Sequence, residues 1–522
     1  GTVKIKIYNW SYSSARTLKY DPVAVYTIED YNTILDVPLY RILPAGEYLM
    51  VIEAEGSIKE YTSDSGTIYH GPDSEQAVIK MDVIFTEESA KYFNTVNGKS
   101  GYEYVSNETT ENEKENARKI YEGYLDDLTT FPVTMTIGDT DYKGFGTDFS
   151  LVSQNTVTKG KAEVTTTILN HNSGLQFTVI SSLYPEYGAY EWTIYFKNTG
   201  IVNSPIVKNL KTANVTFSGK DPYLYTNCTV TDLYRPYEAA IKDNIYFAPN
   251  SGRSSEGAFP FYNLEFGEQG TLIAIGWTGQ WCANFNRPDN ESTTFTAGQE
   301  NFNTYLKPGE QARTPLVSFV YYEGRNTDRT TNLWRHWYID CNAPRDEQGN
   351  LFQPYMSCYT GQFTSEMGAT TESQQMNFLQ TYLNNGIKLK WWWMDALWHT
   401  DFGNWVPDKN RFPTGLKAIS DLAANNGMKT LLWFSPECTT YKKSSPELKT
   451  DGSTPLSDWI IEGYATASGL NLMDWSNPDC IMWFTERITS TMKAGGISLY
   501  REDMNYYPGA DWNTINAKDS ER

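Results

Sequence analysis

The sequence has no basic run and no long apolar segment. Its 522 residues carry 43 Lys and Arg against 63 Asp and Glu, a net charge of -20, which argues against nucleic acid or an anionic membrane as a partner. No apolar stretch approaches the roughly 20 residues that span a bilayer, so membrane insertion is not expected. The expected partners are neutral or cationic ligands, and a homo-oligomer stays an open alternative.

Histidines are also few, and closely spaced cysteine pairs are absent from the sequence. The chain has 4 His and 6 Cys, and because no two cysteines form a C-x-x-C pair, a zinc site is not expected and disulfides cannot be assigned from spacing. Aromatic residues are abundant instead, with 37 Tyr, 16 Trp and an aromatic content of 15%. Aromatic rings suit sugar faces, but aromatic-rich cores of large β-sheets explain most of them better.

The chain is too long for one hydrophobic core, and its patterns predict four segments. Residues 1–100 alternate β-prone runs with turns and predict a small β-sandwich, for which a carbohydrate-binding module and a plain structural domain are both open. The β-prone runs are VKIKIYNW (3–10), VAVYTI (23–28), EYLMVIEAEG (47–56) and AVIKMDVIF (77–85). Residues 101–130 predict a linker with a short helix: VSNETTENEKENAR (105–118) reads as solvated chain, and the helix is expected near 117–127. Residues 131–340 carry many further strands and predict a large two-sheet sandwich.

Residues 341–522 alternate short apolar strands with longer amphipathic segments, the rhythm of a parallel barrel. The expected strands are 354–361, 387–395, 428–437 and 497–505. The helical segments ESQQMNFLQTYLNNG and TGLKAISDLAANNG end in Asn-Gly, a left-handed helix stop, and PDCIMWFTERITSTMKAGG closes on Gly-Gly in the same way. Four such units make the first half of a (β/α)8 TIM barrel, which cannot close its ring alone. Either a partner segment is missing or the barrel interpretation fails, and the fold class is multidomain β plus α/β.

Three of these four strands end in carboxylates. Asp395, Glu437 and Asp503 lie where the C-terminal ends of parallel strands open to solvent. The loops between them add three tryptophans, Trp398, Trp405 and Trp475. Carboxylates with aromatic walls suit glycoside hydrolysis, which needs an acid and a carboxylate beside the sugar. The alternative, at even odds for any one acid, is a helix cap.

Strand periodicity assigns faces to the second and fourth strands. In KLKWWWMDALW (388–398), Trp391, Trp393 and Asp395 share one face, while Trp392 and Met394 point toward the helices.

The fourth strand places Arg501, Asp503 and Asn505 on one face, so Arg501 and Asn505 flank Asp503. A neighbouring guanidinium favours the ionised carboxylate, which suits a nucleophile better than a proton donor. A structural ion pair is the alternative.

Five motifs in this order resemble glycoside hydrolase family 36 of clan D, the α-galactosidases and α-N-acetylgalactosaminidases, over about residues 131–522. The motifs are MDALW (394–398), GNWVPDKNRFPTGL (403–416), GMKTLLWFSPE (427–437), LMDWSNPD (472–479) and YREDMN (500–505). The resemblance implies a β-supersandwich followed by a (β/α)8 barrel that removes terminal α-linked galactose-type sugars with retention.

By this resemblance, Asp503 matches the nucleophile and Arg501 matches a lysine beside it. Asp395 matches the second acid of a pair that grips the sugar hydroxyls, and Trp405 a tryptophan of the pocket wall. Glu437 matches the glutamate of a W-x-x-P-E element, where a structural role and sugar contact are equally open. The residues expected to bind the sugar are therefore Asp395, Trp398, Trp405, Trp433, Glu437, Arg501 and Asn505.

The sequence also departs from the family pattern. Met394 stands where the first acid of the pair is usual, Asn404 replaces an Asp, and no counterpart of a frequent arginine appears near Ser468. A divergent branch is expected, with galactose, N-acetylgalactosamine or galactosamine as the sugar. The family's general acid/base lies on a later strand, so residues 1–522 alone are expected to hydrolyse almost nothing. A truncated chain is the expected explanation, and whether the chain is truncated stays open.

Two other functions stay open. One is a carbohydrate-binding protein with a degenerate barrel, and the other a transglycosylase of the raffinose-synthase kind. The expected partner is an oligosaccharide or glycoconjugate substrate. Because the chemistry needs only two carboxylates, no cofactor or metal is expected. By analogy, the protein is expected to be a secreted or cell-surface microbial enzyme.

Overall fold

The computed structural model describes residues 3–9, 22, 24–28, 48–54, 108–230, 233–324, 327–352, 356–359, 370–387, 389–396, 398–441, 456–461, 469–504 and 506–512. The chain divides into two compact units, Gly1–Ser106 and Asn107–Arg522. Within the described ranges, no helix has the length and apolar character that crossing a membrane requires.

The first unit contains a three-stranded antiparallel sheet in the order β2-β1-β3. Its strands are β1 (Val3–Asn9), β2 (Ala24–Ile28) and β3 (Tyr48–Ala54). All three coincide with predicted β-prone runs, and β1 is central because it pairs with both neighbours. A further predicted run, AVIKMDVIF (77–85), lies outside the described residues. The small β-sandwich therefore stays a prediction.

The second unit opens with α3 (Glu111–Asp126), so the solvated chain predicted for 105–118 is wrong from Glu111 onward. Thr110 and Glu113 start the helix with a capping box. The Thr110 hydroxyl accepts a hydrogen bond from the Glu113 backbone N–H, and the Glu113 carboxylate accepts one from the Thr110 N–H. These two bonds satisfy helix-start donors that would otherwise need water, which is why helix forms without an apolar run.

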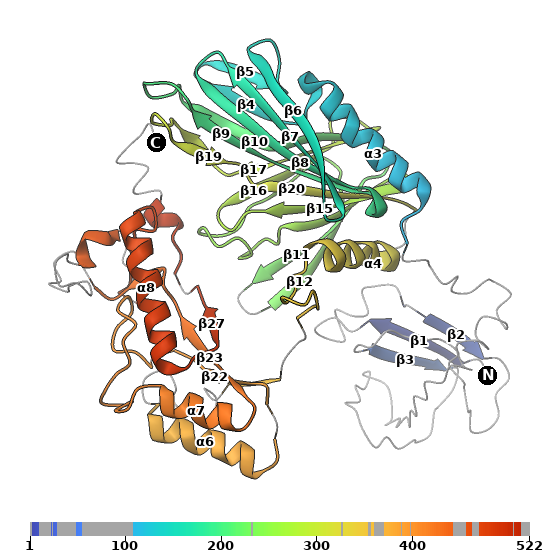
Figure 1. Ribbon diagram of the computed structural model, residues 1–522. Coiled ribbons are helices and arrows are strands. Elements are labelled where there is room, and N and C mark those ends of the chain that lie inside the picture. Colours follow the sequence, from blue (N-terminus) through green and yellow to red (C-terminus); the bar gives the residue numbers. More distant parts are fainter. Residues whose placement is uncertain are drawn as a thin grey trace. The chain divides into compact units, whose positions relative to one another are not determined.

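Two large antiparallel sheets follow α3 (Figure 1). The ten-stranded sheet has the order β12-β11-β14-β15-β20-β9-β8-β7-β6, with β19 beside β9. In chain order its strands are β6 (Phe149–Lys159), β7 (Ala162–His171), β8 (Leu175–Tyr184), β9 (Ala189–Asn198), β11 (Tyr223–Val230), β12 (Leu233–Ala240), β14 (Phe261–Phe266), β15 (Gln269–Gly276), β19 (Gln311–Arg313) and β20 (Leu316–Glu323).

The seven-stranded sheet has the order β13-β16-β17-β10-β4-β5, with β18 beside β10. Its strands are β4 (Thr134–Ile137), β5 (Thr140–Lys143), β10 (Val207–Ser218), β13 (Asn244–Phe247), β16 (Trp281–Asn286), β17 (Ser292–Gln299) and β18 (Asn303–Thr304).

The inward faces of these two sheets share one core. Along β8, buried and half-buried side chains alternate, as expected for a strand with one face in the core. Large rings fill the space between the sheets, and Trp192 stacks on Phe319 with ring centroids 5.2 Å apart. The large two-sheet sandwich is thus confirmed, and its core takes up much of the aromatic content. Helix α4 (Thr327–Trp337) follows the sandwich.

The last part of the second unit is a parallel sheet in the order β21-β22-β23-β27. Its strands are β21 (Ser357–Tyr359), β22 (Trp391–Met394), β23 (Lys429–Phe434) and β27 (Leu499–Glu502). Between them lie α6 (Glu372–Asn384), α7 (Lys417–Asn425) and α8 (Pro478–Gly495). All four predicted strands are confirmed, and their parallel pairing is that of part of a (β/α)8 barrel.

The helices of this part end where the sequence predicts. Gly386 and Gly427, which close the two Asn-Gly stops, have φ of 73° and 76°, and Gly496 caps α8 in the left-handed conformation. A small antiparallel sheet that the sequence did not predict lies between β23 and α8. Its strands are β24 (Cys438–Thr439), β25 (Ile460–Ile461) and β26 (Asn471–Met473).

Candidate functional site

The carboxyl ends of β22, β23 and β27 meet at one edge of the parallel sheet. The register pairs Trp393 with Leu431 and Trp433 with Arg501, and the backbone N–H of Asp503 donates to the Phe434 carbonyl at 2.9 Å. Because these strands run the same way, the residues that follow each of them leave at the same edge. The three predicted carboxylates therefore all follow strands that end at this edge.

Two of the described side chains, Trp433 and Arg501, bind the Asp503 carboxylate. Its Oδ2 accepts a hydrogen bond of 3.0 Å from Trp433 Nε1 and lies 3.2 Å from Arg501 Nη1. The Arg501 guanidinium lies over the ring of Trp393, 4.7 Å from its centroid. Arg501 and Asp503 thus share a face of the strand as the period-2 pattern predicts. The predicted partner Asn505 lies outside the described residues.

The faces predicted for β22 are those observed. Trp392 is fully buried and donates its indole N–H to Gln375 of α6 at 3.0 Å, and Met394 is buried in the core beneath the helices. Met394 therefore points away from Trp393, whose ring packs against the Arg501 guanidinium. Asp395 follows at the strand end, partly buried, with its Oδ1 accepting from the Ala396 N–H at 2.7 Å.

The predicted tryptophans form a buried aromatic cluster. Trp398, Trp405 and Trp433 are all almost fully buried, and the Trp398 indole N–H donates to the Trp433 carbonyl at 2.9 Å. Trp405 packs on Trp398 and Trp433 with ring centroids 6.3 and 6.0 Å away. Such close packing restricts the rotamers that the rings can adopt. Sugar contact by Trp398 and Trp405 stays a prediction.

Glu437 is buried, and its Oε1 accepts a hydrogen bond of 2.7 Å from the Ser435 hydroxyl in the same turn. Burial and a local hydrogen bond match the structural alternative considered for this residue. Its role in sugar binding stays a prediction.

His399 belongs to the same cluster and was not predicted. Its ring lies nearly parallel to Trp433, at 9° and 6.2 Å, and 4.7 Å from the Trp405 ring centroid. Burial, helped by the nearby Arg411 charge, lowers the pKa of His399 to about 4. The signal that could have found it is the scarcity of histidine together with its place directly after the MDALW motif.

We expect this neutral, buried His399 to make the protein less stable in mild acid. The unfolded chain takes up the proton near pH 6.5 and the folded one only near pH 4, so stability falls as pH decreases through this window. The loss is at most about 3 kcal/mol for a shift of this size. Urea unfolding between pH 7 and pH 4 measures it. A His399→Phe variant should lose part of this pH dependence, a His336→Gln variant should keep it, and equal pH dependence in all three proteins would contradict the prediction.

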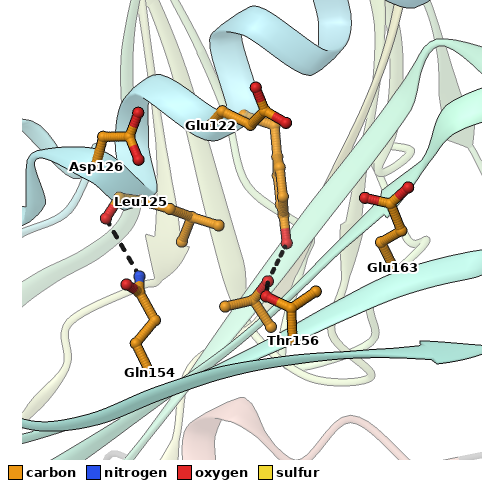
Figure 2. A pocket seen from close by; sticks show the side chains of 8 residues that line it. Glu122, Leu125, Asp126, Gln154, Thr156 and Glu163 are labelled. Carbon is orange, nitrogen blue, oxygen red and sulfur yellow. Dashed lines mark hydrogen bonds between the residues drawn. The ribbon is translucent and has the colours of Figure 1, made fainter.

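A separate pocket of about 320 Å³ lies in the sandwich between α3 and the strands β6 and β7 (Figure 2). The residues that line it are Tyr121, Glu122, Leu125, Asp126, Gln154, Thr156, Glu163 and Thr165. Arg118 pairs with two of its carboxylates, 3.1 Å from Glu122 and 2.7 Å from Glu163. None of the predicted site residues lines this pocket. Among the described residues, no cluster of His, Cys, Asp and Glu side chains could hold a metal ion.

Comparison with family models matches residues 352–521 to the glycosyl hydrolases family 31 TIM-barrel domain. This is a different family from the one that the motifs resemble, and it agrees with them on the barrel and on glycoside chemistry. Two curated relatives are α-galactosidases. AgaA of Geobacillus stearothermophilus is 23% identical over 216 residues, 39% of this chain. Mel36A of Lactobacillus acidophilus is 25% identical over 215 residues, 38% of this chain.

Solved structures of family 36 α-galactosidases share the fold. A variant of AgaA from Geobacillus stearothermophilus, in complex with raffinose, superposes with a TM-score of 0.59 at 17% identity, covering 72% of this chain. AgaB from the same organism has a TM-score of 0.59 at 16% identity, covering 74% of this chain. The match spans 28% of each curated relative and 55% and 60% of these two solved chains. The fold is thus a β-sandwich followed by part of a barrel.

Proposed function

We propose that the protein is a retaining, exo-acting glycoside hydrolase that removes terminal α-linked galactose-type sugars, with Asp503 as the nucleophile. The observation that carries this proposal is the Asp503 carboxylate at the end of β27, held by Arg501 and Trp433. A carboxylate paired with a guanidinium stays ionised, as a nucleophile must. The relatives named above are α-galactosidases, which supports hydrolysis of α-galactosides.

In this proposal the reaction is a double displacement. Asp503 attacks the anomeric carbon and forms a covalent glycosyl-enzyme, while a general acid gives its proton to the departing oxygen. Water then attacks the same carbon as the bond to Asp503 breaks, and the acid, now a base, takes up the proton of that water, which frees the sugar and the Asp503 carboxylate. The proposal assigns the general acid/base to a carboxylic acid on a later barrel strand, as the family resemblance implies.

Sugar binding is proposed to use Asp395, which follows the neighbouring strand β22. Its carboxylate would accept hydrogen bonds from sugar hydroxyl groups. Met394, a thioether side chain buried beneath the helices, offers no second carboxylate to those hydroxyls. Galactose, N-acetylgalactosamine and galactosamine are therefore all kept as candidate sugars.

Covalent trapping tests the proposal. The longest form of the protein that its gene encodes is incubated with a fluorinated galactosyl inactivator, digested and analysed by mass spectrometry. The label is expected on the peptide that contains Asp503, since fluorine at C2 slows the second step and the glycosyl-enzyme accumulates. A label on any other residue refutes the assignment.

The same samples distinguish the proposed hydrolase from the two alternative functions, a carbohydrate-binding protein and a transglycosylase. Binding of a galactose-configured inhibitor without any labelling would favour the carbohydrate-binding protein. Transfer products formed in the presence of a sugar acceptor would favour the transglycosylase.

A further inference from the structure

We propose that Trp433 is a positioning residue for Asp503: its indole N–H holds one carboxylate oxygen so that the other faces the anomeric carbon. The inference rests on the proposed function and deepens it. Trp433 is among the residues expected to bind the sugar, and the task inferred here is a different one, at the nucleophile.

The argument starts from the contacts of Asp503 Oδ2. Trp433 Nε1 donates to this oxygen at 3.0 Å, and Arg501 Nη1 lies 3.2 Å from it on the same strand face. Hydrogen bonds to an ionised oxygen are strong and draw charge onto it. Oδ2 is therefore held in place, and we assign the attack on the anomeric carbon to Oδ1. In the first step a bond forms between Oδ1 and the anomeric carbon as the bond to the departing oxygen breaks, and that oxygen takes the proton of the general acid.

The indole is rigid enough for this task. Its side chain is only 2% exposed, its ring is nearly parallel to that of His399, and it meets Phe402 edge-on at 5.8 Å. The Trp433 carbonyl accepts the Trp398 indole N–H, which fixes the backbone as well. A side chain packed on several sides keeps one rotamer, so its N–H keeps one direction. A ring covered to this extent also has little face left on which a sugar could stack.

Arg501 could not fix the carboxylate in the same way by itself. Its side chain is 28% exposed, packs over the ring of Trp393 and forms an ion pair of 3.2 Å with Oδ2. The guanidinium attracts Oδ2 by its charge, whereas the buried indole donates a hydrogen bond whose direction is fixed by the packing of the ring. The indole and the guanidinium therefore act on the same oxygen by different means, the first by a hydrogen bond and the second by an ion pair.

Trapping kinetics with the fluorinated galactosyl inactivator test the inference. Trp433→Phe removes the N–H and keeps an aromatic ring. We expect the rate constant for labelling Asp503 to fall about ten- to a hundred-fold, the range for losing a hydrogen bond to a charged group. The half-saturating inactivator concentration should not change, and the acid limb of the rate should move to higher pH because the ionised form has lost a donor. The matched control is Trp483→Phe, a buried tryptophan of α8, which should label at the wild-type rate.

A second measurement does not depend on turnover. In nitrogen-15 NMR spectra of the tryptophan-labelled protein, the indole resonance lost in Trp433→Phe should move as Asp503 titrates, and Asp503→Asn should abolish that movement. Wild-type labelling kinetics in Trp433→Phe would overturn the inference. A higher half-saturating inactivator concentration with an unchanged rate constant would also overturn it, because that result indicates a sugar contact. An indole resonance whose pH dependence is the same in Asp503→Asn as in the wild type would overturn it as well. If the inactivator never labels the wild-type protein, the proposed function is refuted, and the positioning role of Trp433 is refuted with it.

Discussion

The Asp503→Asn variant is expected to lose turnover of α-galactosides by on the order of 10³-fold or more, because an amide cannot form the glycosyl-enzyme and removal of a covalent nucleophile is among the costliest changes in enzymes. The amide has the size of the carboxylate and can still accept from Trp433 through its oxygen. Asp503 is also 39% exposed, so the fold should tolerate the change. Steady-state kinetics with an aryl α-galactoside measure the loss, in the longest form that the gene encodes.

The matched control is Glu502→Gln, one residue earlier on the same strand. Glu502 is exposed and its Oε2 accepts from the Tyr500 hydroxyl at 2.9 Å, on the opposite strand face from Asp503. Turnover by the Glu502→Gln variant should stay near that of the wild type. Comparable losses in both variants would point to damage at the strand end, and an active Asp503→Asn variant would exclude Asp503 as nucleophile.

Local patterns predicted the parts of this site that depend on one strand at a time. Arg501 and Asp503 are two residues apart, so strand periodicity alone places them together, as observed. The same rule separated Trp393 from Trp392 and Met394. The parallel strands followed from the spacing of apolar runs and Asn-Gly helix stops, which are also local signals.

Contacts between distant segments could not be predicted in this way. The Trp433–Asp503 hydrogen bond joins residues 70 positions apart and depends on the register between β23 and β27. His399 gains its low pKa only when a loop folds over neighbouring strands and buries it. The early start of α3 was readable from the T-x-x-E spacing of its capping box, but the low apolar content of the segment outweighed that signal.

The second large effect is expected on stability, where α3 meets the sandwich at Glu113. Its side chain is fully buried, and its carboxylate binds Arg329 through two contacts of 2.8 Å. It also accepts the backbone N–H groups of Glu323 and Thr110. Burial by itself raises the pKa of Glu113, but these hydrogen bonds outweigh it and leave the pKa below its usual value. The carboxylate is therefore ionised, and it joins the starts of α3 and α4 to the end of β20.

Glu113→Ala should lower the free energy of unfolding by about 3–5 kcal/mol, because it leaves the Arg329 charge buried without its partner. Urea unfolding followed by tryptophan fluorescence measures this loss. Glu115→Ala, exposed on the same helix, should change stability by less than about 0.5 kcal/mol. Arg329→Met should destabilise about as much as Glu113→Ala, and the double variant should cost clearly less than the sum of the two, since neither partner is then left as a lone buried charge. Additive losses would show instead that the two residues stabilise the protein independently.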